Sequence, residues 1–249
     1  MTRAAFRRCA IATAVVGLVA AAAQAPRLLR YIPAFRVEHV RVMGTRYLAP
    51  HEALALSGIT RASNVFDDPA PWRAALMAHP LVSDVRIERE LPGTLVLTVT
   101  EVEPVALART PVLRAVDGAG RVLPIDLTAF DIDLPVLGGQ AEVAPDGRLR
   151  DPVAMAMVKA AAWLRTRAPE LAARVSEIAP AAGGALRLVL RDPAGSEVLL
   201  PGEPGAVRLE QLRLTIADLA AREELDRIRR IDVRYRDQVV VSLTPGIKG

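Results

Sequence analysis

The chain has 249 residues, 51% of them hydrophobic, so it has enough apolar side chains for two domain cores and is not a mostly disordered protein. Its one cysteine excludes an internal disulfide framework and a cysteine-based zinc site. The net charge of +4 is too small to indicate a partner by itself.

An uncharged stretch from Cys9 to Pro26 follows three arginines near the N-terminus. It has about the minimum length of a membrane-spanning helix. We expect residues 1–8 to be a cytoplasmic tail, residues 9–26 a transmembrane signal-anchor and residues 27–34 a linker. One alternative is a signal peptide cleaved after Ala25, because Ala23-Gln24-Ala25 fits the small-x-small cleavage pattern. A buried core helix is the other.

The segment at residues 35–103 has the pattern of a small α+β module. The predicted elements are a strand over 35–42, a helix over 50–57, a helix from Asp68 to His79, and strands over 83–89 and 94–101. In the last two strands apolar and polar residues alternate, which is typical of a sheet with one buried face. The order β-α-α-β-β predicts two helices on one face of a three-stranded sheet.

Residues 104–244 contain more strands and turns. The predicted elements are a hairpin of 112–116 with 121–123, helices over 152–166 and 206–221, and strands over 185–190, 197–200, 228–235 and 238–243. Asp117-Gly118-Ala119-Gly120 provides the turn of the hairpin. Leu209, Leu212, Ile216 and Leu219 recur at helical spacing on the apolar side of the second helix.

No motif indicates catalysis or a cofactor. His51-Glu52 begins like a zinc-protease motif, but position 55 is alanine where the second histidine ligand would stand. There is no glycine-rich phosphate loop and no serine elbow. The arginines within 222–236 alternate with acidic residues, which favours a salt-bridged face over a nucleic-acid site. We expect no catalytic, cofactor or metal residues, no small-molecule substrate and no nucleic-acid partner.

Five short motifs follow one another along the chain. They are VEHVRVMG at 37–44, LMAHPLVSDVRIERELPGTLVLTVTEVEPVA at 76–106, VDGAGRVL at 116–123, LPVLG at 134–138 and IDVRY at 231–235. The first resembles the opening strand of a POTRA domain. Together, the five resemble the FtsQ/DivIB cell division proteins over about residues 9–244. The chain departs from that pattern in its short cytoplasmic tail, its alanine-rich span and the valine that replaces leucine at position 233.

The resemblance implies an α+β fold with a POTRA domain at 35–103, a mixed α/β "β domain" with a mainly antiparallel sheet at 104–244, and a tail at 245–249. It implies a non-catalytic divisome scaffold of the bacterial inner membrane, with a cytoplasmic N-terminus, a periplasmic bulk and enrichment at the septum. The implied partners are FtsB and FtsL-type single-pass proteins, and the implied role is to link early and late division proteins and regulate septal peptidoglycan synthesis. The alternatives are a POTRA-containing outer-membrane assembly or secretion component and a secreted binding module.

The last predicted strand is the candidate binding site. Residues 239–243 carry no charge, whereas open edge strands normally carry blocking charges, so the strand is either internal to the sheet or an edge with a partner. In the family that the chain resembles, this strand accepts a strand of FtsB, a mode known as β-augmentation. The candidate partner-binding residues are Arg234, Tyr235, Asp237, Gln238, Val239, Val240, Val241 and Ser242. Tyr235 is alternatively a core residue, and Arg234 a solvated one.

Overall fold

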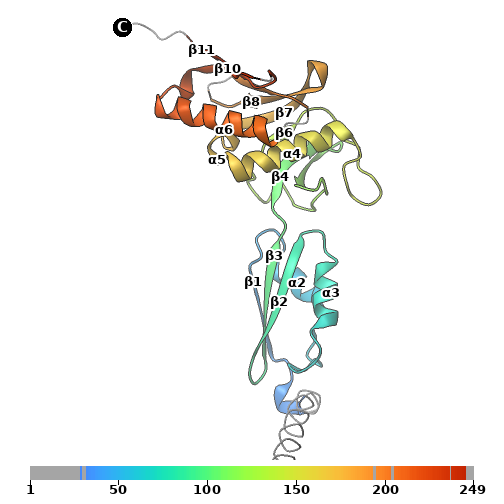
Figure 1. Ribbon diagram of the computed structural model, residues 1–249. Helices are drawn as coiled ribbons and strands as arrows, with labels where there is room; N and C mark the ends of the chain where they lie inside the picture. The colour runs from blue at the N-terminus through green and yellow to red at the C-terminus, as the bar shows by residue number, and fades with distance from the viewer. Residues whose placement is uncertain (1–28, 30–31, 193–194, 203–204, 236, 245–249) are drawn as a thin grey trace, which may run out of the picture. The chain divides into compact units, whose positions relative to one another are not determined.

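The computed structural model describes residue 29 and residues 32–192, 195–202, 205–235 and 237–244. The predicted cytoplasmic tail at 1–8, the membrane segment at 9–26 and the tail at 245–249 lie outside these residues. No helix within the described ranges is both long enough and apolar enough to cross a membrane. The chain divides into two compact units, Met1–Val102 and Glu103–Gly249 (Figure 1).

The first unit has the β-α-α-β-β order that the sequence predicts. A short 3-10 turn η1 (Pro33–Phe35) precedes β1 (His39–Met43), α2 (Pro50–Ser57), α3 (Ala70–Met77), β2 (Val82–Glu90) and β3 (Thr94–Glu101). The sheet order is β1-β3-β2, with β1 parallel and β2 antiparallel to β3. Helix α3 packs on β2, and α2 packs on β1 and α3. The predicted strand over 35–42 is wrong at its start, because the Arg36 N–H donates to the Pro33 carbonyl and closes η1.

The core of the first unit follows the predicted alternation. Leu95, Leu97 and Val99 on the central strand are almost completely buried. Trp72 and Leu76 on α3 are buried as well. Thr94, Thr98 and Thr100 alternate with these strand residues and are partly or fully exposed, as expected for a sheet with one covered face, although Val96 is buried.

The second unit contains an eight-stranded mixed sheet. Its strands are β4 (Pro104–Arg109), β5 (Leu113–Asp117), β6 (Val136–Leu137), β7 (Val175–Ala181), β8 (Ala185–Leu190), β9 (Glu197–Leu200), β10 (Ile228–Asp232) and β11 (Val240–Leu243). Their order in the sheet is β11-β10-β9-β8-β7-β6-β4-β5. The longer pairings, β4 with β5 and β7 with β8, are antiparallel, whereas β6 pairs parallel with β4 and β7. Antiparallel pairing therefore predominates, as predicted.

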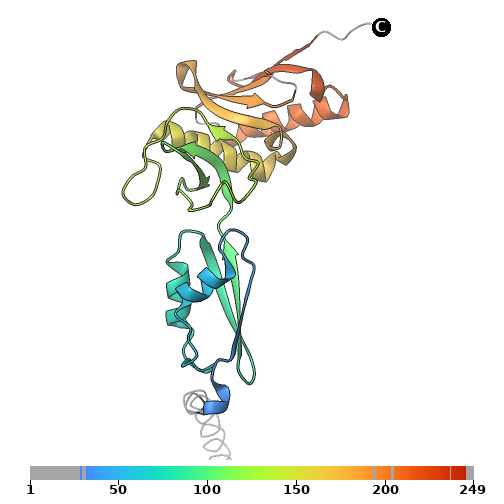
Figure 2. The same ribbon diagram turned by 180° about the vertical axis from the view of Figure 1, so that it is seen from behind.

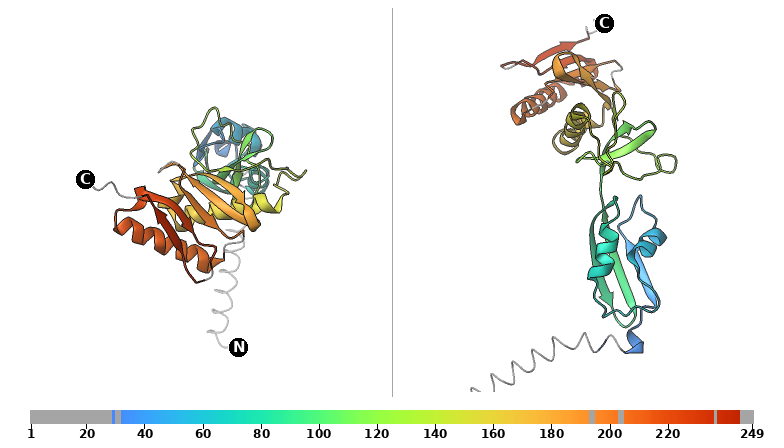
Figure 3. Two further views of the ribbon diagram at one scale, coloured as in Figure 1. Left: turned by 90° about the horizontal axis from the view of Figure 1, so that it is seen from above. Right: turned by 90° about the vertical axis from the view of Figure 1, so that its right-hand side faces the viewer.

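Two long helices cover the same face of this sheet (Figures 1 and 2). They are α4 (Pro152–Arg167), which the short α5 (Pro169–Ala172) follows, and α6 (Ala206–Ala221). Leu212, Ile216 and Leu219 of the predicted apolar face of α6 belong to the core that α4 and the strands share, and Leu209 is buried as well. Seen from above, the opposite face of the sheet carries no helix from the described residues of the second unit (Figure 3).

The predicted hairpin of 112–116 with 121–123 is present as a short antiparallel contact around the predicted turn, with Val116 opposite Val122. The longer pairing of β5, which the sequence did not indicate, is with β4. Strands β4 and β7 were not predicted. Residues 104–108 are all buried, so β4 shows no alternation, and Pro180 interrupts the pattern of β7.

Candidate partner-binding edge

Strand β11 lies at one end of the eight-stranded sheet. On one side it pairs antiparallel with β10, with Asp232 opposite Val240 and Arg230 opposite Ser242. Within the described chain no strand pairs with its other side. The sequence allowed this strand to be either internal to the sheet or at its edge, and the structure shows that it is at the edge (Figure 3).

The direction of each backbone N–H on β11 follows from one hydrogen bond. The Thr244 N–H donates to the Arg227 carbonyl at 2.8 Å, toward the β10 side. Successive residues of an antiparallel strand direct their N–H and C=O groups to opposite sides. The groups of Ser242 and Val240 therefore face β10, whereas those of Val241 and Leu243 face the open edge.

The side chains of β11 divide between the two faces of the sheet. Val241 and Leu243 are half-buried and, with Val239, pack against the core of the second unit. Val240 and Ser242 are exposed on the opposite face. A strand added to this edge would therefore meet an apolar row on one face and solvent on the other.

The other end of the sheet is covered by the chain itself. The Asp117 N–H of β5 donates to the Arg121 carbonyl at 3.0 Å, and the Leu123 N–H donates to the Ala115 carbonyl at 2.8 Å. The segment 121–123 thus occupies backbone groups that an added strand would need. Of the two ends of the sheet, β11 is the one that the described chain leaves uncovered.

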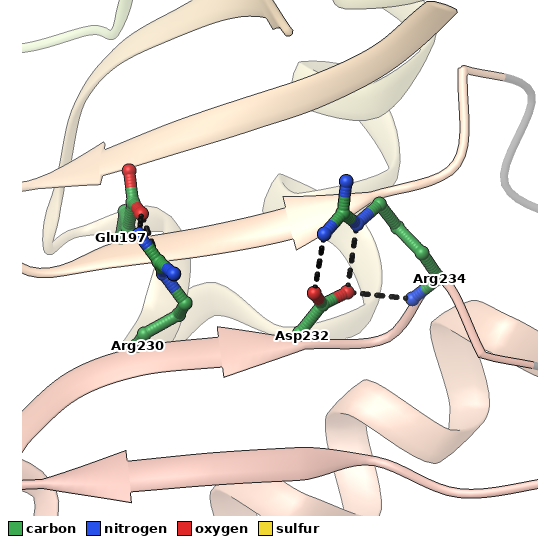
Figure 4. Close-up of polar contacts among 4 residues, drawn as sticks. All are labelled: Glu197, Arg230, Asp232 and Arg234. Carbon is green, nitrogen blue, oxygen red and sulfur yellow. Dashed lines mark hydrogen bonds and ion pairs between the residues drawn. The ribbon is translucent and has the colours of Figure 1, made fainter. Parts of the chain in front are cut away.

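A buried carboxylate fixes the chain where β10 ends. Asp232 is 5% exposed and accepts hydrogen bonds from Arg234 Nε at 2.9 Å, Nη2 at 2.6 Å and the backbone N–H at 3.1 Å (Figure 4). These bonds from Arg234 hold the pKa of the Asp232 carboxyl below its usual value, although burial acts in the opposite direction. Arg234, predicted as a partner contact or a solvated residue, is thus also an intramolecular ion-pair partner, and its side chain is 38% exposed.

Further polar contacts tie β10 to the segment that contains β9. Arg230 Nε donates to Glu197 Oε1 at 2.6 Å (Figure 4). The buried Ser196 hydroxyl donates to the Ile228 carbonyl. Together with the parallel pairing of β9 and β10, these bonds give β11 a firmly held neighbour.

The remaining predicted site residues lie between β10 and β11. Tyr235 follows the end of β10 and is 49% exposed, so the alternative of a core position is wrong. The predicted strand over 228–235 ends at Asp232, whose carboxylate accepts the Arg234 backbone N–H and so closes a turn at this point. Asp237 and Gln238 are exposed and precede β11.

Sequence reasoning did not single out Asp232 or the Glu197–Arg230 pair. The ion pair of Asp232 with Arg234 could have been predicted, because residues two positions apart lie on the same face of a strand. Among the described residues no three His, Cys, Asp or Glu side chains are grouped so as to hold a metal ion. The chemistry of this edge is that of backbone pairing, with charged side chains beside it.

Two family models match the chain. Residues 35–101 match the FtsQ-type POTRA domain, and residues 106–234 match the C-terminal region of cell division protein FtsQ/DivIB. The second match ends at Arg234, before β11 begins.

Several curated proteins are similar over most of the chain. Cell division protein FtsQ of Myxococcus fulvus is 30% identical over 212 residues, which are 82% of this chain and 72% of that protein. The FtsQ of Geotalea daltonii is 26% identical over 84% of this chain and 76% of its own length. The FtsQ of Syntrophotalea carbinolica is 30% identical over 52% of this chain and 46% of its own length.

Proposed function

This chain belongs to the FtsQ/DivIB family of cell division proteins, and we propose that it serves in division as a non-catalytic scaffold. In this proposal residues 9–26 anchor it in the bacterial inner membrane with the bulk in the periplasm, where it gathers at the septum. FtsB and FtsL-type single-pass proteins are its partners, and through them it links early and late division proteins and regulates septal peptidoglycan synthesis. The match over 106–234 favours this role over an outer-membrane assembly component.

The open edge of β11 is the observation that supports partner binding. An uncharged, uncovered edge strand is a hazard for a protein that works alone, because its free backbone groups pair with other chains. Among the residues that the structure describes, 121–123 covers the other end of the sheet and none covers this one. We propose that a strand of an FtsB-type partner completes the sheet here, through the backbone groups of Val241 and Leu243.

The two faces of β11 indicate the chemistry of that strand. Side chains of the added strand beside Val241 and Leu243 would extend the apolar core, so we expect apolar residues at every second position. The intervening positions, beside Val240 and Ser242, face solvent and suit polar residues. Arg234 has five side-chain N–H donors, and its bonds to Asp232 use two of them, which leaves capacity for a partner carboxylate.

Proline substitutions on neighbouring residues test the proposal. Val241→Pro removes an N–H that faces the open edge, whereas Val241→Ala keeps this N–H and removes only side-chain atoms. We expect Val241→Pro to weaken binding of a purified FtsB-type partner about ten-fold or more, from a lost backbone hydrogen bond and the ring's steric conflict. Val241→Ala should weaken it by a smaller factor.

A second proline distinguishes the edge from the sheet itself. Val240→Pro removes an N–H that faces β10, so we expect it to loosen β11 in the free protein as well. Val241→Pro should leave the β10–β11 pairing intact, which amide exchange at Val240 and Ser242 would show. Normal partner binding by a folded Val241→Pro protein would exclude β11 as the docking strand.

A further inference from the structure

Three segments meet at the end of the first unit where the chain arrives from its N-terminal segment. They are residues 32–38, residues 61–67 and the turn at 91–93 between β2 and β3. Asn64 Nδ2 donates to the Ile32 carbonyl at 3.2 Å, and the Glu38 N–H donates to the Gly93 carbonyl at 2.8 Å. Figure 1 shows η1 and the β2–β3 turn at this same end of the unit.

This end exposes apolar side chains at its tip. Leu91 is 60% exposed in the β2–β3 turn, and Ile32 is 41% exposed just before η1. Pro33 and Pro92 beside them are also exposed. In the same segments, the half-buried rings of Phe35 and Phe66 pack edge to face with centroids 5.0 Å apart. This end of the first unit therefore exposes aliphatic side chains close in sequence to a packed aromatic pair.

The sequence limits how far this end can lie from the proposed membrane anchor. The uncharged stretch ends at Pro26, six residues before Ile32. A fully extended chain covers about 3.3–3.6 Å per residue, so Ile32 lies within about 20 Å of the end of the anchor. This step rests on the anchor that is part of the proposed function.

We propose that the end of the first unit formed by Ile32 and the Leu91 turn is a membrane-contacting surface that inserts these two side chains at the headgroup boundary. Aliphatic side chains at that boundary leave water without crossing the bilayer. Exposed charged residues of both signs lie in these three segments or next to them: Arg36, Arg61, Arg89, Glu38, Asp68 and Glu90. Apolar burial rather than attraction to anionic lipid therefore holds the contact, and it should form equally well on neutral phosphatidylcholine.

Site-specific fluorescent labels on the full chain in phosphatidylcholine vesicles test this contact. Cys9→Ser removes the native cysteine, and Leu91→Cys then places a label at the tip. Met77→Cys is the matched control, because Met77 is an aliphatic residue, 38% exposed, that precedes the opposite end of β2. The nine residues of β2 extend over about 30 Å. Val16→Cys reports on the anchor itself.

We expect the label at 91 to be about three-fold less accessible to aqueous iodide than the label at 77, and to be quenched by nitroxides carried on lipid headgroups. Added anionic lipid should leave this ratio unchanged. Equal iodide access at 91 and 77 with a protected label at 16 would refute the contact and leave the anchor standing. Free access of iodide to the labels at 16, 77 and 91 would refute both the contact and the anchor. Protection at 91 that disappears as the protein is diluted in the bilayer would identify a second copy as the occupant, and would overturn the lipid contact.

Discussion

Replacing Asp232 with asparagine tests whether the buried carboxylate holds the end of β10. The substitution keeps the shape and one acceptor oxygen but removes the charge that Arg234 contacts through two side-chain nitrogens and its backbone N–H. Hydrogen bonds to a charged group contribute about 1.5–3 kcal/mol each, and the 38% exposure of the Arg234 side chain reduces that value through solvent screening. We expect Asp232→Asn to lower the unfolding free energy of the second unit by about 1–2 kcal/mol at pH 7.

The pH dependence provides the sharper measurement. Arg234 lowers the folded-state pKa of Asp232 below that of an unfolded aspartate, which is about 3.9. The stabilisation is therefore fully present above about pH 4 and is lost as pH falls through the folded-state pKa. The chain has two tryptophans, Trp72 in the first unit and Trp163 in the second, so urea unfolding in a Trp72→Phe background reports on the second unit alone.

Two outcomes would refute the argument about Asp232. One is an unchanged free energy of unfolding at pH 7. The other is a difference between wild type and Asp232→Asn that persists undiminished well below pH 4. Arg234→Gln removes the other partner of the ion pair and is the matched control. The double variant should lose less free energy of unfolding than the sum of the losses of the two single variants.

Three further substitutions test the first unit, with its unfolding followed through Trp72. Gly44 has φ +81° and a Cβ there would lie 2.3 Å from the Val99 carbonyl oxygen, whereas Gly58 has φ +73° and open space around it. Gly44→Ala should therefore cost about 2 kcal/mol or more and Gly58→Ala about 1 kcal/mol, and equal costs would exclude the clash as the cause. Glu101 accepts bonds from the N–H groups at positions 46, 47 and 48 at 2.9 Å each, so Glu101→Ala should cost about 1–3 kcal/mol, and a change within error would contradict that anchoring role.

The sequence predicted elements whose burial is one-sided. The alternation at 94–101 and the helical spacing of Leu209, Leu212, Ile216 and Leu219 both correspond to faces that the structure buries. Strand β4 is buried on both faces, so its sequence lacks the period that distinguishes strand from helix. The turn motif at 117–120 predicted the short contact of β5 with 121–123 but not its longer pairing with β4, because a turn motif specifies only a local reversal and the second partner is set by the packing of the sheet.

For the candidate site, the sequence predicted an uncharged last strand. It did not predict which residues lie next to this strand or which backbone hydrogen bonds hold it. Nothing local indicates that β10 pairs with β9, about thirty residues earlier in the chain. The end of β10 has a local cause, since Asp232 accepts the Arg234 N–H, and Tyr235 follows this turn in an exposed position. The edge position of β11 likewise depends on the order of all eight strands, which is a property of the whole sheet.

Because β11 is hydrogen-bonded on one side only, we expect its backbone amides to alternate between protected and unprotected. In the free protein the N–H groups of Val240 and Ser242 face β10 and should exchange slowly, whereas those of Val241 and Leu243 face the open edge and should exchange fast. An added partner strand would bond the second pair, so the alternation should disappear in the complex, with protection at Val241 rising as partner concentration exceeds its dissociation constant. Slow exchange at Val241 in the free protein would mean that its N–H is already bonded, and the edge would then not be open. Protection that rises uniformly along β11 on partner binding, including at Val240, would indicate general stabilisation of the second unit rather than strand addition, because only strand addition distinguishes odd from even positions.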